Sequence, residues 1–121
     1  MAWSFTSDRP VYIQVAERIR RSVLCGDFPA GSQIPTVRQL ATDAAVNPNT
    51  IQHAFAELES EGLIVSKGTL GRFVTDEHDI ISECRNKEAK ALVSDFVKKA
   101  SQLSISEESL INMIKEDINN G

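Results

Sequence analysis

The segment from Thr36 to Gly62, TVRQLATDAAVNPNTIQHAFAELESEG, constrains the fold most, because it predicts two short helices joined by a tight turn. Thr36 can cap the first helix, and Gln39, three positions later, completes a T-x-x-Q capping box. Asn47 is a favoured N-cap for the second helix, and Pro48 suits the first helical position because the amide hydrogen it lacks would have no partner there. Gly62 can then end the second helix in a left-handed conformation.

The second of these helices has an apolar face and a polar face. Apolar residues recur at the i, i+3, i+4, i+7 spacing of a buried helix face, at Ile51, Ala54, Phe55 and Leu58. The side chains left outside are polar: Asn49, Gln52, His53 and Glu57. Asn and Gln amides match the donor and acceptor edge of adenine in the major groove, and a helix N-terminus favours phosphate. The pattern is typical of a DNA-binding helix-turn-helix, but a plain helical hairpin in an all-α core has the same pattern.

The residues after Gly62, LIVSKGTLGRFVT, favour the DNA-binding alternative. Two short runs rich in β-forming residues, 63–66 and 72–75, flank a turn that contains glycine and predict a β-hairpin. Lys67 and Arg72 are expected near the tip of that hairpin. A basic hairpin directly after a helix-turn-helix is a wing, so the combination predicts a winged-helix DNA-binding module. A winged helix that makes protein contacts without binding DNA is the alternative function.

The charge distribution neither supports nor excludes a nucleic-acid partner. The 121-residue chain has a formal net charge of −4, and its length suits one domain or a small domain with an appendage. Residues 1–75 hold seven Lys or Arg and seven Asp or Glu, so the whole negative charge comes from residues 76–121. A neutral module can still bind DNA when its basic residues share one face.

The sequence lacks the motifs that other functional classes require. No apolar run is long enough to cross a membrane, and the apolar start at Trp3–Phe5 is too short for a signal peptide. Cys25 and Cys84 come without a C-x-x-C spacing or a nearby histidine pair, which favours a reduced, cytoplasmic chain without a metal site. The sequence has no G-x-S-x-G, no phosphate-binding glycine loop and no H-E-x-x-H, so it predicts neither an enzyme nor a cofactor. On the exposed helix face, His53 is open to two interpretations: a base or phosphate contact, or a solvated surface residue.

Residues 76–121 predict two amphipathic helices that form a region of their own after the winged helix of residues 1–75. Ser106 can cap the second of these helices. Two helices of this size cannot bury their apolar faces alone, so they must pack on the winged helix or on another copy of the chain. We expect a homodimer. The apolar residues expected in its interface are Leu92, Phe96, Leu103, Leu110, Met113 and Ile114. The region is also too short to enclose a pocket of ~300 Å³ within one chain, so any small-molecule effector is expected to bind between subunits.

Four stretches together resemble the GntR family of bacterial transcription regulators. They are PVYIQVAERIR, GDFPAGSQIPTVRQLA, VNPNTIQHAFAELESEGLI and GRFV, and the resemblance covers Pro10 to Val74. The VNPNT turn and the short C-terminal region resemble the YtrA subfamily in particular. This resemblance implies a mainly α fold with a small β-hairpin, a winged helix-turn-helix followed by two C-terminal dimerisation helices. It also implies a homodimer on a two-fold symmetric operator, and many YtrA-like members are repressors.

The resemblance also implies which residues lie at the DNA. Arg38 takes the place of a family arginine that contacts phosphate or guanine, and base reading falls on the start of the second helix. The full set expected at the DNA is Thr36, Arg38, Asn47, Asn49, Thr50, Gln52, His53, Lys67, Gly68, Thr69 and Arg72. Pro48 and Gln52 stand where the common S-R-T-T-V-R-E pattern has arginines, so the operator is expected to differ from those of the larger subfamilies. Thr69 and Leu70 replace a glycine and a basic residue that are usual in the wing.

Overall fold

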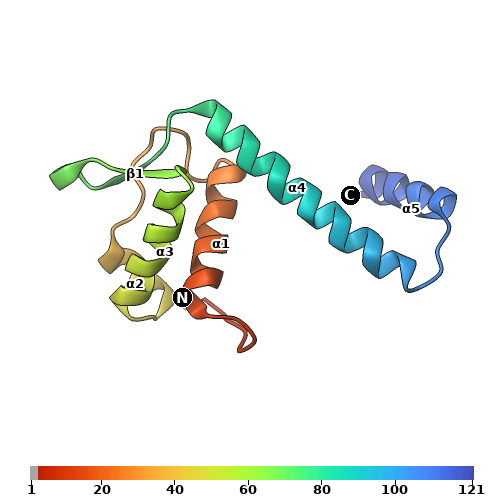
Figure 1. Ribbon diagram of the computed structural model, residues 1–121, viewed down its shortest axis with the longest axis horizontal. Helices are drawn as coiled ribbons and strands as arrows, with labels where there is room; N and C mark the ends of the chain where they lie inside the picture. The colour runs from red at the N-terminus through yellow and green to blue at the C-terminus, as the bar shows by residue number, and fades with distance from the viewer. Residues whose placement is uncertain (1–2) are drawn as a thin grey trace. The chain divides into compact units, whose positions relative to one another are not determined.

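The computed structural model describes residues 3–121, which form two compact units (Figure 1). The first unit ends at Cys84, and the second runs from Arg85 to Gly121. In chain order the elements are α1 (Val11–Leu24), α2 (Val37–Ala44), α3 (Pro48–Ser60), β1 (Ile64–Ser66), the 3-10 turn η1 (Gly68–Leu70), β2 (Arg72–Val74), α4 (His78–Ser101) and α5 (Glu107–Asn120). This order confirms the predicted fold class, a mainly α chain with a small β-hairpin.

The core of the first unit lies between α1 and α3, which run side by side, and α2 packs on α3 (Figure 1). The apolar face predicted for α3 is buried at each of its four positions. The largest fully buried side chains of the unit are Phe55, Ile19, Ile51, Leu58, Leu63, Ile64, Val15 and Val74. Because this core holds α3 along its length, the opposite face of the helix is presented on a rigid support.

The ends of α2 and α3 form as the sequence predicts. Thr36 Oγ1 accepts a hydrogen bond from the backbone N–H of Gln39 at 3.1 Å, and Gln39 Oε1 accepts one from the Thr36 N–H at 2.8 Å. Asn47 Oδ1 accepts from the Asn49 N–H at 2.8 Å and so caps α3. Between the helices, Ala45 adopts the left-handed conformation with φ 58°. That conformation costs a residue with a Cβ roughly 1–2 kcal/mol, so the tight turn contains some backbone strain.

The hairpin that follows α3 is joined by residues from the loop before α2. β1 and β2 pair antiparallel, with Ser66 opposite Arg72. Gln33 adds a bridge to Phe73, and its Nε2 donates to the carbonyl of Leu70 at 2.8 Å. Pro29 and Pro35 flank the short extended segment that contains Gln33, so it pairs with the wing through an isolated bridge.

The first turns of α4 belong to the core of the first unit. Ile81 is 7% exposed, and Ile80 Cδ1 would lie 3.4 Å from a Cβ built on Gly62. Gly62 itself has φ 78°, so it both ends α3 in the predicted left-handed conformation and leaves room for α4. The compact unit therefore runs to Cys84, because these side chains complete its core, and the functional division after residue 75 stays a prediction.

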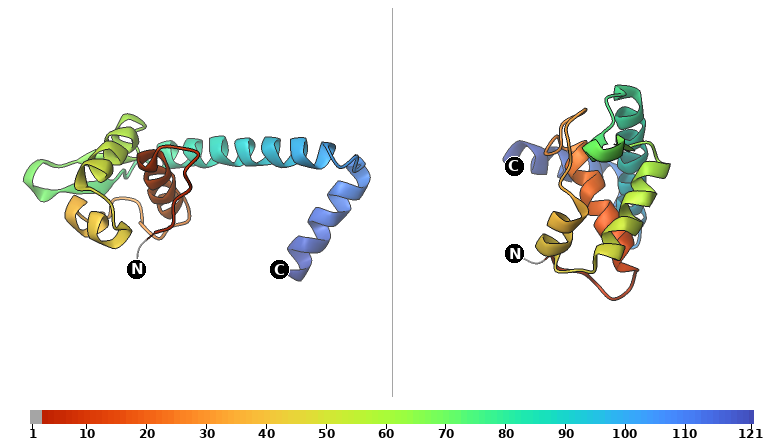
Figure 2. Two further views of the ribbon diagram at one scale, coloured as in Figure 1. Left: turned by 90° about the horizontal axis from the view of Figure 1, so that it is seen from below. Right: turned by 90° about the vertical axis from the view of Figure 1, so that its left-hand side faces the viewer.

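The second unit consists of the rest of α4, a turn and α5. Ser106 Oγ accepts from the Ser109 N–H at 3.2 Å, which confirms the predicted cap. The two helices diverge from the turn that joins them, as Figure 2 shows, so most of their apolar side chains stay open to solvent. In residues 85–121, Ala100 alone is classed as buried.

Candidate functional site

The outer face of α3 carries the polar side chains that the sequence placed there. Asn49, Gln52 and His53 are exposed on the first turns of the helix, while Ile51 and Phe55 on its inner face are fully buried. The amide groups of Asn49 and Gln52 can each donate and accept a hydrogen bond. Thr50, which was expected at the same surface, is only half-buried beside them. The arrangement can present hydrogen-bonding groups to an edge of a base while the helix stays fixed.

Thr36 and Asn47 have a structural task in this region. Both are exposed, and the side-chain oxygen of each accepts from a backbone N–H at the start of α2 or α3. Their caps therefore set the start of both helices. Arg38 is exposed in the first turn of α2, where its guanidinium can reach outward. A DNA contact by any of these three residues stays a prediction.

His53 is held by α1. Its ring stacks on the ring of Tyr12, with centroids 3.4 Å apart and planes inclined by 6°. Neither interpretation of His53 from the sequence included this contact, because Tyr12 lies on a different helix far from His53 in the chain. The stack links α1 to the exposed face of α3 and restricts the rotamers that His53 can use toward a ligand.

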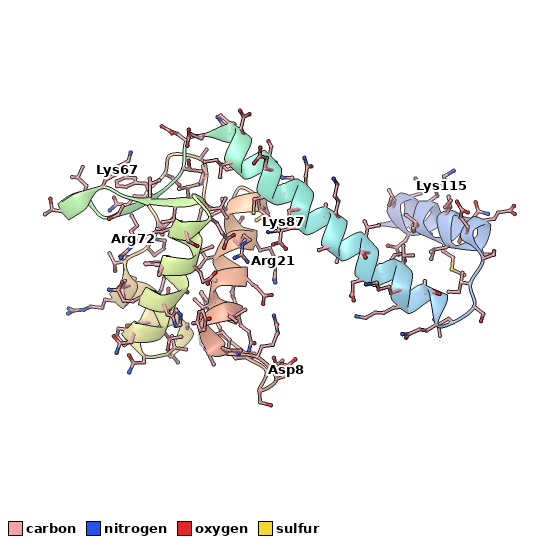
Figure 3. The ribbon with its side chains drawn as sticks, in the orientation of Figure 1. Asp8, Arg21, Lys67, Arg72, Lys87 and Lys115 are labelled. Carbon is pink, nitrogen blue, oxygen red and sulfur yellow. The ribbon has the colours of Figure 1, made fainter. Side chains whose placement is uncertain are left out.

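The wing carries two cations that are placed differently. Lys67, Gly68 and Thr69 are exposed at the hairpin tip, and Lys67 Nζ lies 4.7 Å from the centroid of the Phe73 ring. Arg72 begins β2, but its side chain is directed to α3 instead of the tip, as the labelled side chain in Figure 3 shows. The sequence did not predict this second arrangement.

Arg72 makes three contacts with α3. Its Nε donates to Glu59 Oε1 at 2.6 Å, and its Nη2 donates to Gln52 Oε1 at 3.2 Å. Its Cζ lies 4.8 Å from the centroid of the Phe55 ring. The wing and the exposed face of α3 are therefore joined by one guanidinium.

A different kind of surface occupies the second unit. The exposed fractions of Leu92, Phe96, Leu103 and Met113 are 71%, 44%, 73% and 54%. Ile114 is 39% exposed and Leu110 is half-buried. This exposed apolar set is larger than a soluble monomer usually leaves open, so it is a candidate contact surface.

Two apolar grooves lie between α4 and α5. One has a volume of about 470 Å³ and includes Phe96, Leu103 and Met113, and the other has a volume of about 820 Å³ and includes Val93 and Ile111. The sequence predicted that this region is too short to enclose a pocket of ~300 Å³ within one chain, and both of these grooves are open to solvent. The reason is that the helices diverge, which leaves open grooves instead of an enclosed pocket.

The described residues offer no other site chemistry of the kinds considered from the sequence. Among residues 3–121, no group of three or more His, Cys, Asp or Glu side chains is placed to hold a metal ion. Within the same residues, no helix has the length and apolarity that a membrane crossing requires.

Comparisons with known proteins agree on one family. The family model described as bacterial regulatory proteins, gntR family, matches residues 11–74. The HTH-type transcriptional repressor YtrA of Bacillus subtilis (strain 168) is 30% identical over 111 residues, which are 91% of this chain and 85% of that protein. The solved structure of a GntR family transcriptional regulator from Listeria monocytogenes is 35% identical with a TM-score of 0.86, and the match covers 93% of this chain and 98% of that one. A solved structure of the DNA-binding domain of AraR in complex with operator ORX1 is 31% identical with a TM-score of 0.55, covering 62% of this chain and 93% of that one.

Proposed function

The chain belongs to the GntR family of bacterial transcription regulators and resembles its YtrA-type members, and we propose that it is a repressor that binds a two-fold symmetric operator as a homodimer. Regulators of this family carry a DNA-binding domain and are not enzymes. The repressor role is proposed from the relative YtrA, whose name describes a transcriptional repressor. Since its target would be chromosomal DNA, we propose a cytoplasmic location.

One observation carries the DNA-binding proposal: the rigid α3 presents exposed Asn49 and Gln52 beside an exposed wing. α3 would enter the major groove, where the amides of these two residues can reach base edges. Arg38 and Lys67 are exposed cations on either side of the helix and would contact the phosphates, which fix the protein on the duplex without reading sequence. The other members of the set predicted at the DNA would support these contacts.

The homodimer proposal rests on the second unit. Its exposed apolar side chains line two open grooves, and a second copy of the same surface supplies apolar side chains of the same kind to cover them. Of the residues expected at the interface, Phe96, Leu103, Leu110, Met113 and Ile114 line these grooves, and Leu92 is exposed on α4 outside them. Two joined DNA-binding units would then contact two half-sites, and the second contact becomes intramolecular. If a small-molecule effector exists, these grooves are where its apolar part would compete with the partner.

Selection of bound fragments from a random DNA library, followed by gel shifts at several salt concentrations, tests the proposal. We expect a recovered sequence with two-fold symmetry, bound at least about 10³-fold more tightly than random DNA at physiological salt. Arg38→Ala should weaken binding to the selected and random sequences alike, because a phosphate contact carries no sequence information. Failure to bind any DNA at low salt would refute the proposal and favour a winged helix that serves protein contacts. Recovery of a site without two-fold symmetry would refute the homodimer part.

A further inference from the structure

We propose that Arg72 is a positioning residue that fixes the side chain of Gln52 for base reading, and that it is not a phosphate contact. The inference rests on the proposed function, because it requires that α3 reads the major groove. It assigns to the wing a part in sequence preference that does not depend on the wing touching a base.

The geometry places Arg72 along one face of α3. Its three contacts are at positions 52, 55 and 59 of the helix, which share a face because they are separated by three and four residues. The guanidinium thus joins two side chains whose positions on the helix are two turns apart. Gln52 is nearer the start of the helix, and Glu59 is nearer its end. A planar fork with donors in fixed directions suits this arrangement, whereas a lysine ammonium could satisfy one of the two oxygens at a time.

The charge of Arg72 is already paired. The Glu59 carboxylate is 2.6 Å from Nε, and the two side chains are only 29% and 34% exposed. Two of the three guanidinium nitrogens, Nε and Nη2, already donate to Glu59 and Gln52, and the Glu59 carboxylate balances the charge. A phosphate would therefore gain less from Arg72 than from a cation without a carboxylate partner. Lys67 is exposed at the tip of the hairpin, and its Nζ lies over the Phe73 ring instead of beside a carboxylate. Among the wing cations, Lys67 is therefore the one suited to phosphate.

The contact with Gln52 fixes which end of its amide faces outward. Arg72 Nη2 can only donate, so the atom that it contacts at 3.2 Å must be the carbonyl oxygen of Gln52. The amide Nε2 is then directed away from the wing and offers its N–H groups as donors. In the major groove such a donor fits an acceptor, which is N7 of adenine or guanine, O6 of guanine or O4 of thymine. A glutamine without this contact could turn either end of its amide outward.

The experiment uses the full chain and an operator selected with the wild-type protein, in which each base pair of the half-site is replaced in turn. Arg72→Lys keeps the charge but not the fork. We expect it to lose preference at one base pair per half-site, by roughly 5- to 150-fold, with the dependence of log affinity on log salt unchanged. Gln52→Ala should lose preference at the same base pair, and adding Arg72→Lys to it should cause no further loss there. Where purine N7 is the acceptor, a 7-deaza purine at that base pair should weaken the wild type by a similar factor and leave Gln52→Ala unaffected.

A matched pair of variants covers the case in which Arg72→Lys does not fold. Glu59→Gln and Glu57→Gln each remove one negative charge from α3, but Glu59 contacts Arg72 and Glu57 lies exposed on the same helix. Glu59→Gln should reduce the preference at the Gln52 base pair, and Glu57→Gln should not. Equal effects of the two variants on that preference would overturn the proposal.

The outcome that would identify Arg72 as a phosphate contact is distinct. Arg72→Lys would then keep every base preference, and Arg72→Ala would weaken binding to all sequences and reduce the salt slope by about 0.9 for each phosphate that it no longer neutralises. If the wild-type chain selects no sequence at all, the proposed function itself fails before any variant is compared. A selected operator with unchanged preference in Arg72→Lys refutes only the positioning role.

Discussion

Replacing Phe96 with aspartate should separate the proposed dimer into monomers. Phe96 is 44% exposed in one copy, so of the 150–250 Å² that an aromatic side chain can bury, about 90 Å² remains to be covered by a partner. At ~25 cal/mol per Å², this area contributes about 2 kcal/mol per copy, and it counts twice in a two-fold interface. The lost burial alone should raise the dimer Kd about 10³-fold. The carboxylate adds to this, because it would be desolvated without a partner.

Sedimentation equilibrium over a range of protein concentrations measures the dimer Kd, and gel shifts on a full operator and a single half-site measure the consequence for DNA. Wild type should bind the full operator ~10²–10⁴-fold more tightly than the half-site, and Phe96→Asp should lose most of that difference. Ser94→Asp is the matched control, since it adds the same charge to an exposed position of α4 that lines neither groove. Half-site affinity should stay at the wild-type value in both variants.

The reasoning is refuted if Phe96→Asp forms dimers at the same protein concentrations as the wild type and keeps full operator affinity. The same conclusion follows if Ser94→Asp dissociates as readily, because added charge on α4 would then explain the effect without burial of Phe96. Circular dichroism melts check that both variants retain the helix content of the wild type, so that dissociation is not the result of unfolding.

Four further changes test other parts of the molecule. Asn49→Ala should weaken the free energy of binding to the operator by ~1–3 kcal/mol and relax the base preference at one position per half-site, as measured by gel shift. An equal loss of affinity for every sequence would show that Asn49 does not read a base. Lys67→Ala should reduce the salt slope by about 0.9 for each phosphate left without its cation, and an unchanged slope would contradict its role. Gly71→Ala should destabilise the wing, because Gly71 has φ 105°, which a residue with a Cβ rarely adopts, and the new Cβ, 2.8 Å from Gln33 Nε2, would displace that group from the carbonyl of Leu70. Faster amide exchange in β2 would report this. Ala45→Gly should raise the free energy of unfolding by about 0.5–1 kcal/mol in a urea titration, since glycine relieves the left-handed strain; a lower value would contradict that.

The helices of the first unit were predictable because their signals are local. The buried positions Ile51 and Leu58 follow from helical spacing alone, and the caps at Thr36 and Asn47 follow from neighbours at most three residues away. Burial by tertiary packing then agreed with these local preferences. The start of α4 was less evident from the sequence, because Ile81 is buried against core residues of the first unit that come much earlier in the chain.

The contacts that shape the candidate site were not predictable in the same way. Arg72 and Gln52 are 20 positions apart, and no periodicity connects them. The stack of Tyr12 on His53 also joins two helices, and no sequence pattern connects these two residues. Residue types indicated which side chains would be exposed near the DNA, whereas the contacts between those side chains depend on how α1, α3 and the wing pack.

The pairing of Gln33 with the wing has a consequence for the order of folding. Gln33 and Leu70 are 37 positions apart, so their hydrogen bond requires a long loop to close, whereas the α2–α3 turn requires almost none. Contacts of long sequence separation are costly to form early, because the loss of chain entropy precedes any gain from packing. The helical hairpin should therefore gain protection from hydrogen exchange before the wing does. A nascent chain would then hold a formed α3 while β2 is still unpaired, and would acquire its complete DNA-facing surface only in the last step.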